Sequence, residues 1–310
     1  MTTPTELRSL NEAVWEGSLP LEIRLAPSDC RVYDQADVYL IHYPRLSYLP
    51  FILPKLRDFF IPFLINPEVT PHEGWFSFED VPLKWHYPVG LLYDLFSGST
   101  PYEKQAPKNE ENGGEPNDQA LKLPWRLVLH FTDYPGDQLI SLDEEGKVLH
   151  DAFINSVKEA DFLRNGTAKT IMSLSKSDST QLWDAVRNYS FASFNPIYQR
   201  LLNAGGAPLR HIPLRVYLPT SPSASQPNSS HLKVVQSLLT PLQPNSREPQ
   251  TLGMALHSLL PSLFPHRRVP IYAKPVLHGA IVPMGAILEE LLKGAAYLDG
   301  WLHIGVMINH

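Results

Sequence analysis

Two short segments of this 310-residue chain recur in the same order almost 200 residues further along. Residues 19–25 (LPLEIRL) return as residues 212–218 (IPLRVYL), with apolar side chains at the same alternating positions. Residues 88–94 (PVGLLYD) return as residues 283–289 (PMGAILE). The two offsets, 193 and 195 residues, are nearly equal, so two separate elements keep almost one register. Such a repeat predicts that one fold occurs twice in the chain.

The spacing of apolar residues predicts one series of elements in both copies: two strands, a helix, a strand, a short helix and a last strand. This is the order of the β-grasp fold, as in ubiquitin. In the first copy we expect the elements at 19–26, 38–44, 48–60, 75–78, 81–83, 88–96 and 126–131. In the second copy we expect them at 212–218, 232–239, a helix with Thr251 as its N-cap, 269–273, a turn at 278–279, 285–292 and 302–308.

A helical region is expected between the two copies, over residues 144–206. Its first helix carries Leu149, Phe153 and Ala160 at helical spacing and ends at Asn165-Gly166, a C-cap pair. Three further helices are expected: one opened by the capping-box variant Asp178-x-x-Gln181, one over 191–202 that stops at 205–206, and one near the N-terminus over 7–15.

The fold class expected is therefore α+β, with two ubiquitin-like β-grasp domains flanking a helical domain. The expected bounds are 1–137 for the N-terminal helix and first ubiquitin-like domain, 138–206 for the helical domain and 207–310 for the second ubiquitin-like domain. Two segments without periodicity, about 97–121 and about 219–230, are rich in Pro, Ser, Gly or Asn. We expect them to be mobile surface loops, because neither can bury enough apolar area to offset the entropy of ordering it.

Composition and motifs argue against several classes of function. The formal charge of -6 argues against nucleic acid as a partner, because binding phosphates needs an excess of Lys and Arg. Cys30 is the single cysteine, which excludes a disulfide framework and a cysteine zinc site. The common phosphate, dinucleotide and metalloprotease motifs are absent and no two histidines are four residues apart, so we predict no cofactor and no metal. The most apolar stretch, 46–65, contains Lys55, Arg57 and Asp58, so we expect a soluble, cytoplasmic protein without a spanning helix.

Four segments together resemble the autophagy protein 5 family. Residues 43–49 (YPRLSYL) are similar to the family's PRxSYL motif, and residues 81–94 (VPLKWHYPVGLLYD) to its longest signature, PLKWHYPxGLLFD. Residues 157–161 (VKEAD) match its KEAD segment, and residues 251–253 (TLG) match the opening of its second ubiquitin-like helix. The resemblance extends over nearly the whole chain. The two long loops are the segments that differ from the family's pattern.

The resemblance implies a non-catalytic scaffold and acceptor. Members of the family receive the ubiquitin-like autophagy protein 12 through an isopeptide bond on one lysine, and bind the helical N-terminus of autophagy protein 16 noncovalently. The conjugate then acts E3-like on autophagy protein 3, the E2 that transfers autophagy protein 8 to phosphatidylethanolamine in autophagosome formation. The implied location is cytoplasmic, with peripheral association of the assembled complex with the preautophagosomal membrane.

Carrying the family's lysine across places the isopeptide acceptor at Lys158, inside the KEAD match. At about 100° per residue, Lys158 lies about 180° from Leu149, so periodicity by itself directs its amine away from the buried stripe. Ile154 and Phe162, one turn away on either side, are apolar for such a position. They either contact the attached modifier or pack under a neighbouring helix.

Arg45, Gly90 and Asp94 are the candidate contacts with autophagy protein 16. Arg45 offers a planar donor fork for a carboxylate, and Gly90 lets another chain approach closely because it has no Cβ. Alternatively, Gly90 only lets the short helix pack on its own sheet, and the glycine repeated at position 285 favours that interpretation.

Two other functions stay open. One is a ubiquitin-like binding adapter that carries no covalent modification. The other is a thiol enzyme that uses Cys30, which lies beside Arg31 in a turn-like segment. An adjacent cation favours the thiolate, but no general base is evident nearby in the sequence.

Overall fold

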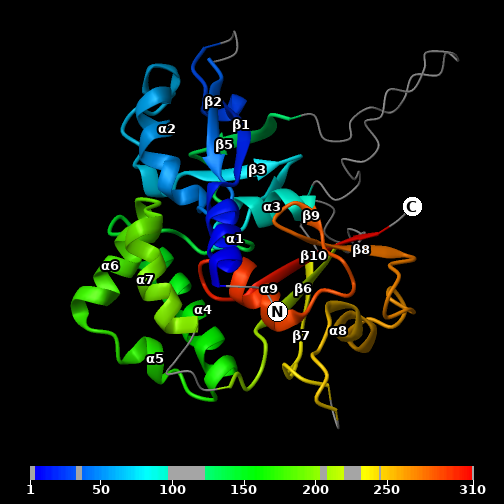
Figure 1. Cartoon of the computed structure of the whole chain (residues 1–310). Helices are drawn as coiled ribbons and strands as arrows, with labels where there is room; N and C mark the ends of the chain where they lie inside the picture. Colours follow the sequence, from blue (N-terminus) through cyan, green and yellow to red (C-terminus); the bar gives the residue numbers. More distant parts are fainter. Residues whose placement is uncertain are drawn as a thin grey trace, which may run out of the picture.

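The computed structural model describes residues 4–32, 37–96, 123–202, 208–219, 232–243 and 246–308. Both segments expected to be surface loops lie outside the described residues, except for Pro219, which ends a strand. The expected helix stop at 205–206 lies outside them as well. The described residues form two five-stranded sheets, helices packed on each sheet, and a group of helices beside them (Figure 1).

The first β-grasp unit (residues 18–130) has the strand order β2-β1-β5-β3-β4. Neighbouring β1 and β5 run parallel, with Leu21 opposite Trp125, and the other pairs are antiparallel. Leu21 and Ile23 of β1 lie in one buried cluster with Phe60 of α2. The elements are β1 (Ser18–Leu25), η1 (Pro27–Asp29), β2 (Tyr39–Pro44), η2 (Leu49–Ile52), α2 (Leu53–Phe60), η3 (Ile61–Phe63), η4 (Pro71–Glu73), β3 (Trp75–Phe78), β4 (Val81–Pro82), α3 (Val89–Phe96) and β5 (Trp125–His130).

The second β-grasp unit (residues 214–308) repeats this topology, with the strand order β7-β6-β10-β8-β9. Here β6 and β10 are the parallel pair, with Leu214 opposite Leu302. The duplicated β-grasp fold predicted from the sequence repeat is therefore confirmed. The elements are β6 (Leu214–Pro219), β7 (Leu232–Gln236), α8 (Leu252–Leu259), β8 (Ala273–Leu277), β9 (Ala280–Ile281), α9 (Leu288–Ala295) and β10 (Leu302–Ile308).

In the second unit, β6 begins at 214 and β7 ends at 236 instead of 212 and 239, and two further boundaries differ more informatively. The strand expected at 269–273 begins only at Ala273, because the preceding Val269, Ile271 and Tyr272 are exposed and belong to no strand. The β-branched and aromatic types of these residues favour a strand, but their packing in the fold leaves them outside the sheet. The helix expected at 285–292 is instead 288–295, since the chain before it pairs with residues of α8 through its backbone.

The helical unit (residues 147–202) contains α4 (Lys147–Asn165), α5 (Lys169–Met172), α6 (Lys176–Arg187) and α7 (Phe191–Leu202). As predicted, α4 ends at Asn165, with Gly166 in the left-handed conformation at φ 75°. The predicted start of α6 at Asp178 is wrong. The N-cap is Ser175, whose hydroxyl accepts a hydrogen bond from the Asp178 N–H, so Asp178 is inside the first turn.

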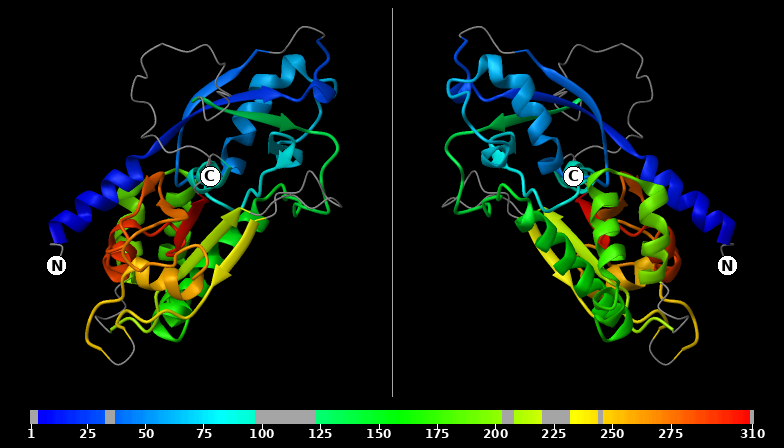
Figure 2. Two further views of the ribbon diagram at one scale, coloured as in Figure 1. Left: turned by 90° about the vertical axis from the view of Figure 1, so that its right-hand side faces the viewer. Right: turned by 90° about the vertical axis from the view of Figure 1, so that its left-hand side faces the viewer.

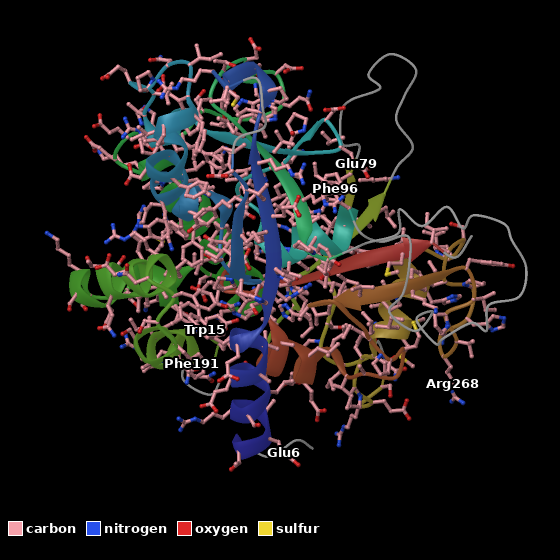
Figure 3. The ribbon with its side chains drawn as sticks, turned by 90° about the horizontal axis from the view of Figure 1, so that it is seen from above. Glu6, Trp15, Glu79, Phe96, Phe191 and Arg268 are labelled. Carbon is pink, nitrogen blue, oxygen red and sulfur yellow. The ribbon has the colours of Figure 1, made fainter. Side chains whose placement is uncertain are left out.

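Helix α1 (Pro4–Glu16) connects the helical unit with the second β-grasp unit. Trp15 stacks on Tyr189 with ring centroids 4.4 Å apart and lies beside Phe191 of α7 (Figure 3). On its other side, the Asn11 side-chain amide donates to the Lys293 carbonyl of α9 at 3.4 Å. Figure 2 shows α1 continuing from β1 along the second unit. Because one buried cluster includes residues of α1, the helical unit and the second unit, these parts share a core.

Candidate functional site

Lys158 lies on the exposed side of α4. The stripe Leu149, Phe153 and Ala160 is buried, as the helical period predicts, and the Lys158 side chain is exposed. Among the residues that the structure describes, its amine makes no hydrogen bond and no ion pair. The Asp161 carboxylate, three residues on, is buried and accepts hydrogen bonds from Asn165 and the Ile171 N–H, so it is directed away from the amine.

Residues on both sides of Lys158 are held against the second β-grasp unit. The Trp301 indole N–H donates to the Ser156 carbonyl at 3.0 Å, and the Ser156 hydroxyl donates to Asp299 at 2.7 Å. Glu159 forms an ion pair with Arg215, whose guanidinium lies 3.8 Å from the centre of the Trp301 ring. These contacts hold α4 in one orientation with Lys158 pointing outward.

A buried polar network supports these contacts from beneath. The Asp299 carboxylate accepts hydrogen bonds from His303 and Ser156, and the other ring nitrogen of His303 lies 2.8 Å from the Tyr217 hydroxyl. Burial by itself raises the pKa of Asp299, but the His303 partner, the Ser156 hydroxyl and the Trp301 N–H outweigh burial and hold that pKa below its ordinary value. Burial raises the pKa of Tyr217 well above its ordinary value, so its hydroxyl stays protonated.

Arg164 holds the C-terminal end of α4 against the second β-grasp unit. Its guanidinium is buried and donates to the Gly300 carbonyl at 3.0 Å. Burial lowers the pKa of Arg164, although a guanidinium remains charged in proteins. Sequence reasoning did not identify Trp301, Arg215 or Asp299, or the contact of Arg164 with Gly300, because nothing in a single sequence indicates that residues more than 50 positions away contact one helix.

The structure separates the two apolar neighbours of Lys158. Phe162 is 57% exposed, whereas Ile154 is half-buried and packs against the main core. Ile154 therefore contributes to the core of its own chain. The contact of either residue with a modifier stays a prediction.

Arg45, Gly90 and Asp94 lie together at a bridge between the two β-grasp units. An Arg45 Nη atom lies 2.5 Å from an Asp94 carboxylate oxygen and 3.2 Å from the Gly90 carbonyl. The second Asp94 oxygen accepts a hydrogen bond of 2.8 Å from the Gly279 N–H in the β8–β9 turn. We call these four residues the inter-unit bridge. The donor fork of Arg45 thus binds a carboxylate of its own chain, and its contact with a partner stays a prediction.

Gly90 is needed at this bridge because of a close approach inside the chain. Its N–H donates to the Arg45 carbonyl at 2.7 Å, and a Cβ at Gly90 would lie 2.7 Å from the Arg45 Cβ. By contrast, a Cβ at Gly285 would meet nothing within 4 Å. The two glycines of the repeat therefore do not share one structural reason, and the glycine at 285 does not explain the one at 90.

Burial dominates the electrostatics of the bridge. It raises the pKa of Asp94, and the Arg45 guanidinium and the Gly279 N–H oppose that rise. Burial lowers the pKa of the neighbouring His278 to about 4. The hydrogen bond to the Ala295 carbonyl opposes this shift, and the Arg45 and His303 charges add to it. Neutral His278 donates its Nε2–H to the Ala295 carbonyl at 2.8 Å, which fixes the turn that carries Gly279.

Within the described residues, no His, Asp or Glu side chain hydrogen-bonds to the Cys30 thiol. The residue is half-buried against the core of the first unit, and its thiol donates to the Val32 carbonyl at 3.4 Å. No group of three or more His, Cys, Asp or Glu in the described part of the chain has the geometry to hold a metal ion. None of the described helices is both long enough and apolar enough to cross a membrane.

Comparison with known proteins gives matches along almost the whole chain. The profile described as Autophagy protein ATG5, UblA domain, matches residues 14–131. The alpha-helical bundle region of the same family matches 146–204, and its UblB domain matches 211–306.

Curated relatives and one solved structure agree with these matches. Autophagy protein 5 of Aspergillus oryzae is 55% identical over 319 residues, covering 98% of each chain. Autophagy protein 5 of Phaeosphaeria nodorum is 54% identical and covers 96% of each chain. The crystal structure of Kluyveromyces marxianus Atg5 superposes with a TM-score of 0.67 at 22% identity, covering 96% of this chain and 99% of that one, and it supports the fold alone.

Proposed function

The chain belongs to the autophagy protein 5 family, and from this membership we propose that it is the acceptor of the ubiquitin-like autophagy protein 12, joined through an isopeptide bond to Lys158. In this step the neutral Lys158 amine attacks the thioester carbonyl that links the modifier to its E2. The C–S bond breaks, an amide C–N bond forms, and the amine loses a proton while the E2 cysteine leaves as its thiol.

The observation that carries the proposal is the state of the amine. Lys158 is exposed, and its nitrogen is free of any ion pair within the described residues, so an E2 can reach it. The helix beneath it is held by Ser156 and Glu159, which contact the second β-grasp unit. A nucleophile on a rigid support loses less entropy when it is positioned for attack than one on a loose segment.

The chain itself is proposed to be non-catalytic. Its conjugate, together with the helical N-terminus of autophagy protein 16, acts E3-like on autophagy protein 3 and promotes lipidation of autophagy protein 8 with phosphatidylethanolamine. We place the complex in the cytoplasm, peripherally associated with the preautophagosomal membrane. Arg45, Gly90 and Asp94 are retained as proposed partner contacts, with the added role of the inter-unit bridge.

We further propose domain bounds of 1–137, 138–206 and 207–310. The three family matches, at 14–131, 146–204 and 211–306, fall inside these bounds. The described elements of each unit fall inside them too.

Replacing the acceptor tests the proposal directly. In a reconstituted conjugation reaction, Lys158→Arg should abolish the covalent adduct while leaving the fold and autophagy protein 16 binding intact. Lys147→Arg is a matched control, because Lys147 is exposed on the same helix and its ion pair with Glu145 is a surface one. An adduct that forms at full yield on the Lys158→Arg variant would overturn the assignment.

A further inference from the structure

A short segment of the second β-grasp unit exposes arginine and apolar side chains together. Residues 266–272 (HRRVPIY) connect α8 to β8. Val269, Ile271 and Tyr272 are 56%, 41% and 54% exposed, and Arg267 and Arg268 are exposed beside them. The segment lies at the rim of the molecule, away from α6 and α7, and the Arg268 side chain points outward there (Figures 1 and 3). We call residues 266–272 the basic-apolar loop.

Both ends of this loop are anchored. Phe264 and Ala273, which flank it, are fully buried, and the Phe264 carbonyl accepts a hydrogen bond of 2.8 Å from His257 of α8. Near its start, the backbone of Arg267 crosses Gly253 so closely that a Cβ at Gly253 would lie 1.9 Å from the Arg267 carbonyl oxygen. Since the loop base is fixed in this way, the fold presents Val269, Ile271 and Tyr272 to solvent, although they could otherwise contribute to a core.

The local charge is opposite to that of the whole chain. Residues 249–288 contain no Asp and no Glu, in a chain with 32 such residues and a formal charge of -6. Within the described residues, Arg267 and Arg268 have no ion-pair or hydrogen-bond partner, and Lys274 follows close behind. The loop is therefore a locally cationic surface that matches an anionic partner.

We propose that the basic-apolar loop binds the surface of an anionic lipid bilayer. Arg267 and Arg268 pair with the headgroup phosphates and carboxylates, and Val269, Ile271 and Tyr272 enter the boundary between headgroups and acyl chains. Apolar tips flanked by cations are the pattern of interfacial membrane segments, and a tyrosine is suited to that boundary because one end is apolar and the other polar. The inference rests on the membrane association in the proposed function and names the residues that make it.

The test is sedimentation of the full, unconjugated chain with large phosphatidylcholine vesicles, with and without about one third phosphatidylserine. The wild type should bind the vesicles that contain phosphatidylserine and bind those of pure phosphatidylcholine much more weakly. At about tenfold per 1.4 kcal/mol and about 1 kcal/mol per arginine, Arg267→Gln with Arg268→Gln should weaken binding about 30-fold. Val269→Ser with Ile271→Ser should weaken it by at least about tenfold.

Matched controls remove equally exposed side chains elsewhere. Leu40→Ser with Ile65→Ser removes two exposed aliphatic side chains of the first β-grasp unit, and Arg126→Gln removes an exposed arginine there. These variants should bind as the wild type does. Because conjugation to Lys158 is assayed without vesicles, a failure of the membrane proposal and a failure of the acceptor assignment give different results. Loop variants that bind as the wild type does, or a wild type that ignores phosphatidylserine, would overturn the proposal. Binding of the loop to an acidic protein, together with no binding of the chain to vesicles, would also overturn the proposal.

Discussion

Removing the charge of Asp94 should destabilise the protein more than its single ion pair with Arg45 suggests. The two side chains are 4% and 11% exposed, so Asp94→Asn leaves a nearly buried guanidinium without a counter-charge. Losing one partner of a buried pair costs about 3–5 kcal/mol. Because Arg45 keeps its bond to the Gly90 carbonyl and an asparagine oxygen can still accept from Gly279, we expect the lower end, about 3 kcal/mol. That is a large part of a typical stability of about 5–15 kcal/mol.

Urea unfolding of the wild type and the variant, followed by circular dichroism, measures this loss as a lower midpoint with little change in slope. A double-mutant cycle separates the pair from its surroundings: Arg45→Met with Asp94→Leu should be less destabilising than the sum of the two single changes, since no unpaired charge stays buried. Hydrogen exchange at the Gly279 amide should speed up in Asp94→Asn. A loss below about 0.5 kcal/mol, or additive single and double changes, would refute this account of the bridge.

Other predictions concern the glycines, pH and the cysteine. Gly90→Ala should lower the free energy of unfolding by about 1–3 kcal/mol because its Cβ meets the Arg45 backbone and Cβ, whereas Gly285→Ala should change it by about 0.5 kcal/mol or less; urea melts compare them. The pKa of His278 is lowered to about 4 in the fold from about 6.5 when unfolded, so its contribution is complete above about pH 6.5 and is lost toward pH 4 at about 1.4 kcal/mol per unit. A His278→Gln variant should show a shallower acid loss, and an unchanged pH profile would contradict this. Cys30→Ser should leave the yield of adduct unchanged, because within the described residues the thiol hydrogen-bonds only to the Val32 carbonyl and to no catalytic base; a lost adduct would revive the thiol-enzyme alternative.

The repeat and the spacing of apolar residues in the two copies were sufficient to predict the topology, because alternate residues of a strand face one core. They give the bounds of β3 and β10 as observed. The same rule fails at Val269, Ile271 and Tyr272, since strand-forming residue types do not reveal that a segment lies outside the sheet. Similarly, Asp178 and Gln181 have the types of a capping box, but Ser175 three residues earlier provides the cap.

For the candidate site, the helical period was sufficient to predict which face of α4 carries Lys158. The support beneath that face depends on Trp301 and Asp299, more than 140 residues away, and only the packing of the two units brings them there. Arg45 was expected to offer its guanidinium to a carboxylate of a partner. In the fold it binds Asp94 of the same chain, which periodicity could not show. Residue types thus predict the chemistry of a group, whereas its partner is decided by tertiary packing.

The most direct test of the central claim is the covalent state of the protein isolated from its own cells. Intact mass should show a stable addition of one small protein, and peptide mapping should find a branched peptide with the modifier's C-terminal residue on the Lys158 Nζ. A population with only the mass of the unmodified chain, or a branch on another lysine while Lys158 is bare, would contradict the account.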